Sequence, residues 1–194
     1  MNKIFNISDF KKLSISEKLD FLEDSFIDAI KDFDEKILYS TLRSIVLNSN
    51  ENAYVRKSAL ELFTELVILG KVKTRHAYNL LIDDWIPNED TSLEIQRLKD
   101  LLLYYDPINE ECGNIELIFK TGIKNSDAEI IGESFFNLGM ISLTKAFRSS
   151  NENEYKIYIK DGDYYFQKSI VEVENRVDSR FYQKIIVILE VSIR

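Results

Sequence analysis

The sequence predicts an all-α protein, in which helical hairpins stack into a right-handed superhelix of about eight to ten helices. Apolar residues recur at intervals of three and four along most of the 194 residues, and only two prolines and six glycines interrupt them. Asn50 and Asp90, forty residues apart, each stand five residues before an aliphatic residue, Val55 or Ile95, with an arginine close behind. Self-similarity at a period of about 40 is typical of stacked hairpins, because one unit alone cannot bury its apolar face.

The first two predicted helices lie before residue 50. Ser14 and Glu17 have the spacing of a capping box, in which each side chain bonds the other's backbone N–H, and this predicts a helix to about Lys31. Asp34 is a candidate N-cap for the next helix. The apolar residues of these helices are Leu19, Leu22, Phe26 and Ile30 in the first, and Ile37, Leu38, Leu42, Ile45 and Val46 in the second.

Three further helices are predicted up to residue 106. One begins at Ala53 and stops at Gly70, and the next begins at Thr74 and ends before Pro87. Thr91 and Glu94 repeat the capping-box spacing at the start of the third. The apolar residues of the Ala53 helix are Val55, Ala59, Leu62, Phe63, Leu66 and Val67.

The segment 34–106 resembles two HEAT repeats, each with a first helix, a short polar turn, an Asn or Asp, and a second helix that carries an aliphatic residue and Arg near its start. The resemblance implies that Asn50, Arg56, Asp90 and Arg97 form a structural ladder between neighbouring hairpins. Asn50 replaces the more usual Asp, and Arg97 is displaced by one position.

The second half contains glycines within helical patterns. Ser126 and Glu129 form a third capping-box candidate for a helix that carries Gly132 and Gly139, seven residues apart and therefore on one face. Each glycine costs a helix about 1 kcal/mol relative to alanine, so an aligned pair predicts a partner helix packed very close.

The second half also resembles a degenerate tetratricopeptide unit. Phe135, Leu138 and Gly139 follow the spacing of that family's first helix, and Gly162, Phe166 and Ser169 follow that of its second. We therefore expect residues 1–108 to form HEAT-like hairpins, and residues 109–194 to form a tetratricopeptide-like region packed on them as one continuous body.

Two interpretations remain open for residues 155–166. A β-hairpin is indicated by the alternation of Tyr155, Ile157 and Ile159 with polar residues before Asp161-Gly162. A helix is indicated by the apolar stripe that runs from Tyr155 and Ile159 to Phe166. The final helix is expected from about Asp178 to Arg194. Its end inside an apolar pattern fits either a docked terminal helix or a module of a larger assembly protein.

Composition limits the cellular compartment and the classes of binding partner that we expect for this protein. The net charge of −8 opposes binding to nucleic acid or to an anionic membrane, and Cys112 is the only cysteine, so no internal disulfide forms. The sequence contains no signal-peptide pattern and no long apolar span. We expect a soluble cytoplasmic protein, and the richness in isoleucine, lysine and asparagine indicates a bacterial source.

Candidate chemistry is sparse, and we expect no catalytic residue, metal or cofactor. His76 is the only histidine, and Cys112 stands beside acidic residues that would raise a thiol pKa. Asp83, Asp84 and Trp85 form an acidic and aromatic group. HEAT-like alkylpurine DNA glycosylases use such residues on a concave face, but they need a basic groove that this acidic chain lacks.

The sequence therefore favours a non-enzymatic protein-interaction or scaffold module, whose acidic concave surface receives a basic protein segment. Aromatic residues off the main apolar stripes are candidate partner-binding residues: Tyr54, Trp85, Tyr104, Tyr105, Tyr158 and Tyr164. One alternative is an acidic immunity or antitoxin protein that blocks a basic nuclease. The glycosylase is a further alternative. The sequence does not settle the oligomeric state.

Overall fold

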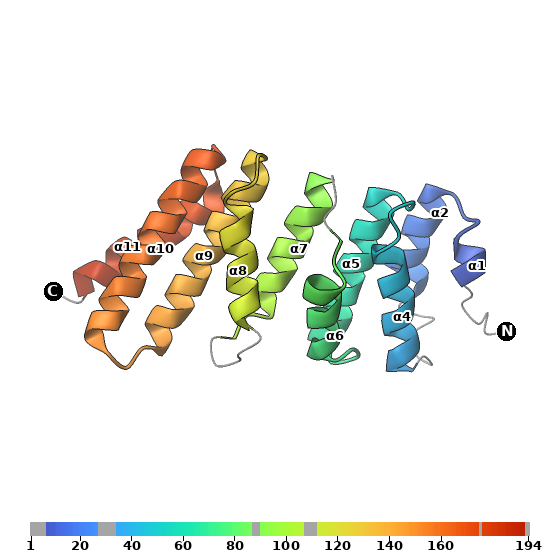
Figure 1. Ribbon diagram of the computed structural model, residues 1–194, viewed down its shortest axis with the longest axis horizontal. Helices are drawn as coiled ribbons and strands as arrows, with labels where there is room; N and C mark the ends of the chain where they lie inside the picture. The colour runs from blue at the N-terminus through green and yellow to red at the C-terminus, as the bar shows by residue number, and fades with distance from the viewer. Residues whose placement is uncertain (1–6, 27–33, 87–89, 107–111, 175, 193–194) are drawn as a thin grey trace. The chain divides into compact units, whose positions relative to one another are not determined.

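The structure is a computed structural model that describes residues 7–26, 34–86, 90–106, 112–174 and 176–192 (Figure 1). Every regular element in these ranges is helical and none is a strand, so the prediction of an all-α protein is confirmed. The chain divides into two compact units, Met1–Arg97 (unit 1) and Leu98–Arg194 (unit 2). The division falls inside one helix, α7 (Thr91–Leu103).

Unit 1 consists of short and medium helices in chain order. A helix can continue directly into a π-helical turn, as α2 continues into η1 and α6 into η3. The elements are α1 (Ile7–Phe10), α2 (Ile15–Asp20), η1 (Phe21–Ser25), α4 (Glu35–Val46), α5 (Ala53–Ile68), α6 (Thr74–Tyr78), η3 (Asn79–Asp83) and the start of α7.

Local signals in the sequence fix most of these boundaries. The capping box at the start of α2 is confirmed, since Ser14 N donates to Glu17 Oε2 at 2.8 Å and Ser14 Oγ accepts from Glu17 N. Asp34 caps α4 as predicted, by accepting from Lys36 N. Gly70 ends α5 with a φ of 69°, a left-handed conformation that favours glycine.

Two other predicted capping boxes are wrong by one residue. Asp90 Oδ1, not Thr91, accepts from Leu93 N, and Asp127, not Ser126, caps α9 (Ala128–Arg148) by accepting from Glu129 N and Ile130 N. A carboxylate is a strong acceptor at a helix N-terminus, where the macrodipole also favours negative charge. In both places the aspartate therefore takes the cap.

The core of unit 1 lies where α5 contacts α4, α2 and α6. The predicted α5 stripe is confirmed, because all six of its residues are buried, whereas Ile37 of the α4 stripe is half exposed. Fully buried residues come from η1, α4, α5, α6 and η3, among them Leu22, Leu42, Val46, Val55, Ala59, Leu60, Phe63, Ala77, Leu80 and Leu81.

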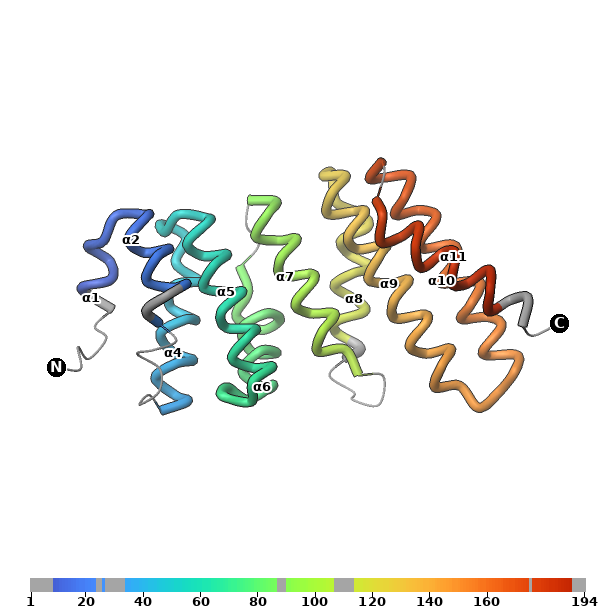
Figure 2. Tube along the Cα trace, turned by 180° about the vertical axis from the view of Figure 1, so that it is seen from behind, coloured from blue at the N-terminus to red at the C-terminus, as the bar shows by residue number. Residues whose placement is uncertain are grey.

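Unit 2 contains α8 (Cys112–Gly122), α9, α10 (Glu152–Glu172) and α11 (Val177–Ser192). Figure 2 shows α10 running back along α9, and α11 running back along α10. Residues 155–166 lie inside α10, so the helical interpretation is confirmed and the β-hairpin is wrong. Ile159 and Phe166 are buried at helical spacing, and this burial outweighs the local turn signal.

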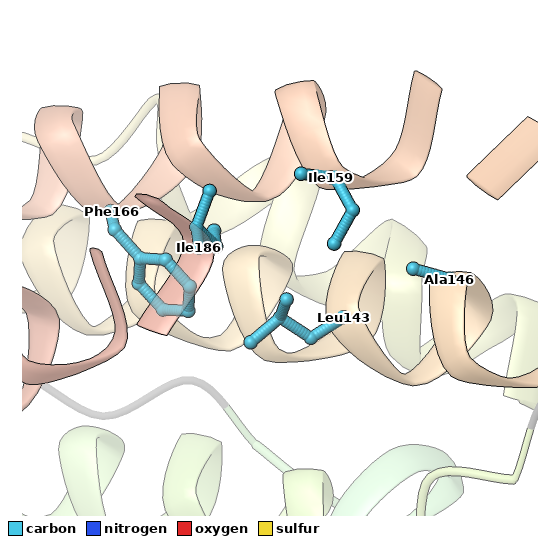
Figure 3. Close-up of a cluster of buried hydrophobic side chains, with 5 residues drawn as sticks. All are labelled: Leu143, Ala146, Ile159, Phe166 and Ile186. Carbon is cyan, nitrogen blue, oxygen red and sulfur yellow. The ribbon is translucent and has the colours of Figure 1, made fainter. Parts of the chain in front are cut away.

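Small residues allow α9 and α10 to approach closely, as the aligned glycines predict. A Cβ on Gly139 would lie 2.6–2.9 Å from the ring of Phe166, and one on Gly132 would overlap Val173. Ser169 Oγ donates to the carbonyl of Gly132 at 2.8 Å. Beside this contact lies a buried cluster of Leu143, Ala146, Ile159, Phe166 and Ile186 (Figure 3).

Candidate interaction surface

Helix caps recur at a constant interval along the first half of the chain. Ser14, Asn52 and Asp90 each accept backbone N–H bonds at a helix start, and they are 38 residues apart. Eight residues after each cap stands a buried leucine: Leu22, Leu60 and Leu98. Asn50 is exposed in the turn before α5, so the counterpart of Asp90 is Asn52, not Asn50.

A basic residue stands four residues after each of the first two caps, and both of these residues are buried. Lys18 Nζ lies 2.8 and 2.9 Å from the two carboxylate oxygens of Glu51, with both side chains about nine-tenths buried. Arg56 Nε donates to the carbonyl of Val46 at 2.7 Å. Lys18 therefore joins α2 to the turn before α5, and Arg56 joins α5 to the end of α4.

The third helix start repeats the bond to the preceding helix with a displaced arginine. Glu94 occupies the position of the cation, and Arg97, three residues later, donates from Nε to the carbonyl of Leu81 at 2.8 Å. Arg97 also binds Glu94 at 2.7 Å and lies over the ring of Trp85. Burial lowers the pKa of Arg97, and Glu94 partly offsets that effect.

An electrostatic contact links two of the predicted ladder residues. Hydrogen bonds from the Ser92 hydroxyl and the Leu93 N–H lower the pKa of Asp90, and the charge of Arg56 lowers it further. Burial lowers the pKa of Arg56, and Asp90 opposes this. The guanidinium of α5 and the cap of α7 therefore attract each other across successive hairpins.

The α2–α5 acidic face is the exposed side of two neighbouring parallel helices. α5 contacts both α2 and η1, and the Lys18–Glu51 pair holds the N-terminal ends of the two helices together (Figure 2). Glu23 and Glu61 both stand nine residues after their caps, and both are exposed. We define the face by its exposed residues: Asp20, Glu23, Tyr54, Glu61, Glu65 and Ile68.

This face combines negative charge with an aromatic side chain. Tyr54, at the start of α5, is 70% exposed, and Ile68 at the other end is 66% exposed. Lys57 Nζ is the nearby cation, 3.7 Å from Glu61. Because the face carries four exposed carboxylates, of which only Glu61 is shown to pair with Lys57, it attracts positive charge.

The predicted partner-binding aromatics divide into exposed and buried sets. Tyr54 and Tyr164 are exposed, and Tyr105 and Tyr158 are half-buried. Trp85 and Tyr104 are buried, which is a correction, since neither presents its ring to a partner. Trp85 instead donates from Nε1 to Glu94 at 2.9 Å, a contact between residues nine apart that apolar periodicity did not reveal.

A second polar group joins α4 to η3 and α6. Arg43 Nε donates to Asp84 Oδ2 at 2.7 Å, and the ring of His76 stacks on Tyr39 with centroids 4.1 Å apart. Burial raises the pKa of Tyr39, and the charge of Asp84 adds to it. Asp84 and His76 therefore take part in contacts between neighbouring helices.

The Asp84→Asn variant is expected to make unit 1 less sensitive to acid. The hydrogen bond from Arg43 holds the pKa of Asp84 below its usual 3.8. Asp84 thus adds stability that is complete above about pH 5 and is lost as pH falls through the lowered folded pKa, and this partly exposed pair contributes within about 1 kcal/mol.

Urea unfolding of wild type and Asp84→Asn between about pH 7 and about pH 2 measures this difference. The difference in unfolding free energy between wild type and Asp84→Asn should shrink as pH falls. Arg43→Gln should show the same difference from wild type, because it removes the hydrogen-bond donor. An equal gap at every pH would contradict the assignment.

Among the described residues, no group of three or more His, Cys, Asp and Glu side chains is placed to hold a metal ion. None of the described helices combines the length and the apolar character needed to cross a bilayer. Comparison with known proteins finds no matching family model, no matching curated protein and no matching solved structure.

Proposed function

We propose that this chain is a helical-repeat superhelix, HEAT-like over residues 1–108 and tetratricopeptide-like over residues 109–194, in one continuous body. The recurrence of caps at Ser14, Asn52 and Asp90 supports the first part. The close antiparallel packing of α9 and α10 through Gly139 and Gly162 supports the second. Repeats of this kind display extended surfaces made from successive helices, which suits binding of another protein.

On this basis the proposed function is that of a non-enzymatic, cytoplasmic protein-interaction module. The α2–α5 acidic face carries the proposal, because it presents four exposed carboxylates and the exposed ring of Tyr54 on two helices in contact. A basic protein segment would gain on-rate and salt-dependent attraction from the carboxylates, and affinity from an aromatic anchor. A basic nuclease is one partner with suitable charge, and this chain would then act as an immunity or antitoxin protein that blocks it.

The acidic excess is not concentrated in one unit. Residues 1–97 hold 13 basic and 17 acidic side chains, and residues 98–194 hold 12 and 16, so each unit has a net charge of −4. Net charge alone therefore does not select a binding surface. The choice of the α2–α5 acidic face depends on its four exposed carboxylates and the exposed Tyr54, which lie on two helices in contact with each other.

The test starts from affinity purification of the chain from its native cell at low and high salt, with the recovered partner then purified. Its affinity is measured for wild type and for a variant with three charge reversals on the face: Glu23→Lys, Glu61→Lys and Glu65→Lys. The reversals should weaken binding about tenfold to a hundredfold at low salt, and much less at high salt.

A matched control carries the same change in net charge elsewhere, on three exposed acids of unit 2: Glu129→Lys, Asp161→Lys and Glu174→Lys. It should bind within about twofold of wild type, if contact with the face rather than total charge governs affinity. Equal loss in both variants would reject the face. Recovery of no partner at either salt would count against the interaction module itself.

A further inference from the structure

Helix α11 has two faces of different environment. Ile186 points into the buried cluster of unit 2 (Figure 3). Ser179, seven residues earlier and therefore on the same side of the helix, is also fully buried. On the opposite side lie Val177, Phe181 and Ile188, exposed by 76%, 58% and 65%, together with exposed Lys184. We define these four residues as the α11 outer stripe.

The spacing of the α11 outer stripe is symmetrical. Its residues follow one another at intervals of four, three and four, which is the spacing of one helix face. Read from either end, the stripe begins and ends with an aliphatic residue. When two such helices pack antiparallel about their midpoint, Val177 of each meets Ile188 of the other, and Phe181 of each meets Lys184 of the other.

We infer that a second copy of this chain covers the α11 outer stripe, in an antiparallel two-fold pair. This interaction is separate from the proposed binding of a basic partner at the α2–α5 acidic face. Each Lys184 would lie over a Phe181 ring of the other copy, so the two-fold axis generates two cation–π contacts from one pair of residues. The apolar ends of the stripe would cover each other at the same time.

Charge selects the antiparallel orientation over the parallel one. In a parallel pair Lys184 would face Lys184 of the other copy, and like charges across an interface are unfavourable. In the antiparallel register the exposed charges beside the stripe meet uncharged side chains. Asp178 lies opposite Ile185, and Arg180 lies opposite Val187. Phe181 and Lys184 stand on the same stripe, so two copies of this helix supply both halves of each cation–π contact. This self-complementarity is the reason to infer a second copy as the occupant.

The pair is expected to be weak and concentration-dependent. Val177 and Ile188 are eleven residues apart, so the contact is about 17 Å long. An interface of this length falls at the small end of specific protein contacts, with a dissociation constant on the order of 10 to 100 µM.

Sedimentation equilibrium of the full chain from about 5 to about 500 µM tests the inference, with circular dichroism to check the fold of each variant. Wild type should shift from monomer to dimer. Phe181→Lys places a second ammonium group against Lys184 of the other copy and should weaken association at least tenfold. Adding Lys184→Phe should restore it, because the double variant exchanges the two residues and keeps every pairing. The control Phe147→Ser, at an exposed site on α9, should associate like wild type.

A wild-type chain that remains monomeric at every concentration would overturn the inference. So would association that Phe181→Lys leaves unchanged or that Phe147→Ser weakens, since another surface would then be responsible. Failure of the double variant to recover would overturn the antiparallel register. None of these results depends on the partner of the α2–α5 acidic face, so the two proposals can fail separately.

Discussion

The Gly139→Val variant is expected to lose about 3 kcal/mol or more of unfolding free energy. A Cβ at this position would lie 2.6 Å from Cε1 and 2.8 Å from Cζ of Phe166. That ring is fully buried and stacks on Tyr182, with centroids 5.6 Å apart, so moving it would disturb this packing. The two branches of valine would push α9 and α10 apart over their whole contact. Urea unfolding monitored by circular dichroism measures the loss.

Gly162→Ala is the matched control, because it lies on α10 in the same helix pair. Its Cβ would meet Ile186 Cδ1 at 3.2 Å, the mobile end of a side chain, and its other neighbours at 3.7 Å. Alanine also gains up to about 1 kcal/mol of helix propensity over glycine, so this variant should be as stable as wild type or slightly more stable. Phe166→Leu should rescue part of the Gly139→Val loss. Equal losses at 139 and 162 would contradict the close approach at Gly139.

Local chemistry made much of the helical framework predictable from sequence. The capping box at Ser14, the cap at Asp34 and the stop at Gly70 each act within one helical turn, so their residue types carry the signal. Where two acceptors stand side by side, spacing alone does not decide between them. This is why Asp90 and Asp127 take caps that a capping-box pattern assigns to Thr91 and Ser126.

The candidate site was less predictable, because it depends on contacts between distant residues. Glu51 is 33 residues from Lys18, and neither belongs to an apolar stripe that would indicate the pair. Trp85 is an aromatic residue at a helix end, the position expected of an exposed anchor, yet Glu94 and Arg97 enclose it. Asn50 resembled Asp90 in spacing, but the backbone N–H groups that need a cap are reached by Asn52. Burial and partner choice depend on how the helices pack.

The ion pair between Glu133 and Arg176 is the second place where a single change is expected to have a large effect. Arg176 Nη2 lies 2.6 Å from Glu133 Oε2, with the Glu133 side chain only 4% exposed and that of Arg176 13% exposed. The guanidinium also lies 4.6 Å from the centre of the Phe136 ring. Glu133→Leu would leave a largely buried positive charge without its counter-ion. We therefore expect a loss of about 3 kcal/mol of unfolding free energy.

The double variant Glu133→Leu with Arg176→Met separates this cost from the net contribution of the pair. Nε of Arg176 is a buried donor with no hydrogen-bond partner among the described residues, so part of the cost of burying the arginine is not recovered in wild type. Replacing both charges by apolar side chains of similar size should restore stability to within about 1 kcal/mol of wild type.

The exposed pair Lys156–Glu152 on α10, with the same 2.6 Å separation, provides the comparison. Glu152→Gln should give no measurable change, because water solvates the lysine when its partner is lost. Urea unfolding of wild type, the two single variants at Glu133 and Arg176 and their double variant gives the coupling energy of the buried pair. Equal losses of unfolding free energy in Glu133→Leu and Glu152→Gln would contradict the prediction. Burial would then not be the cause of the effect at Glu133, and water would have to solvate Arg176 in the variant.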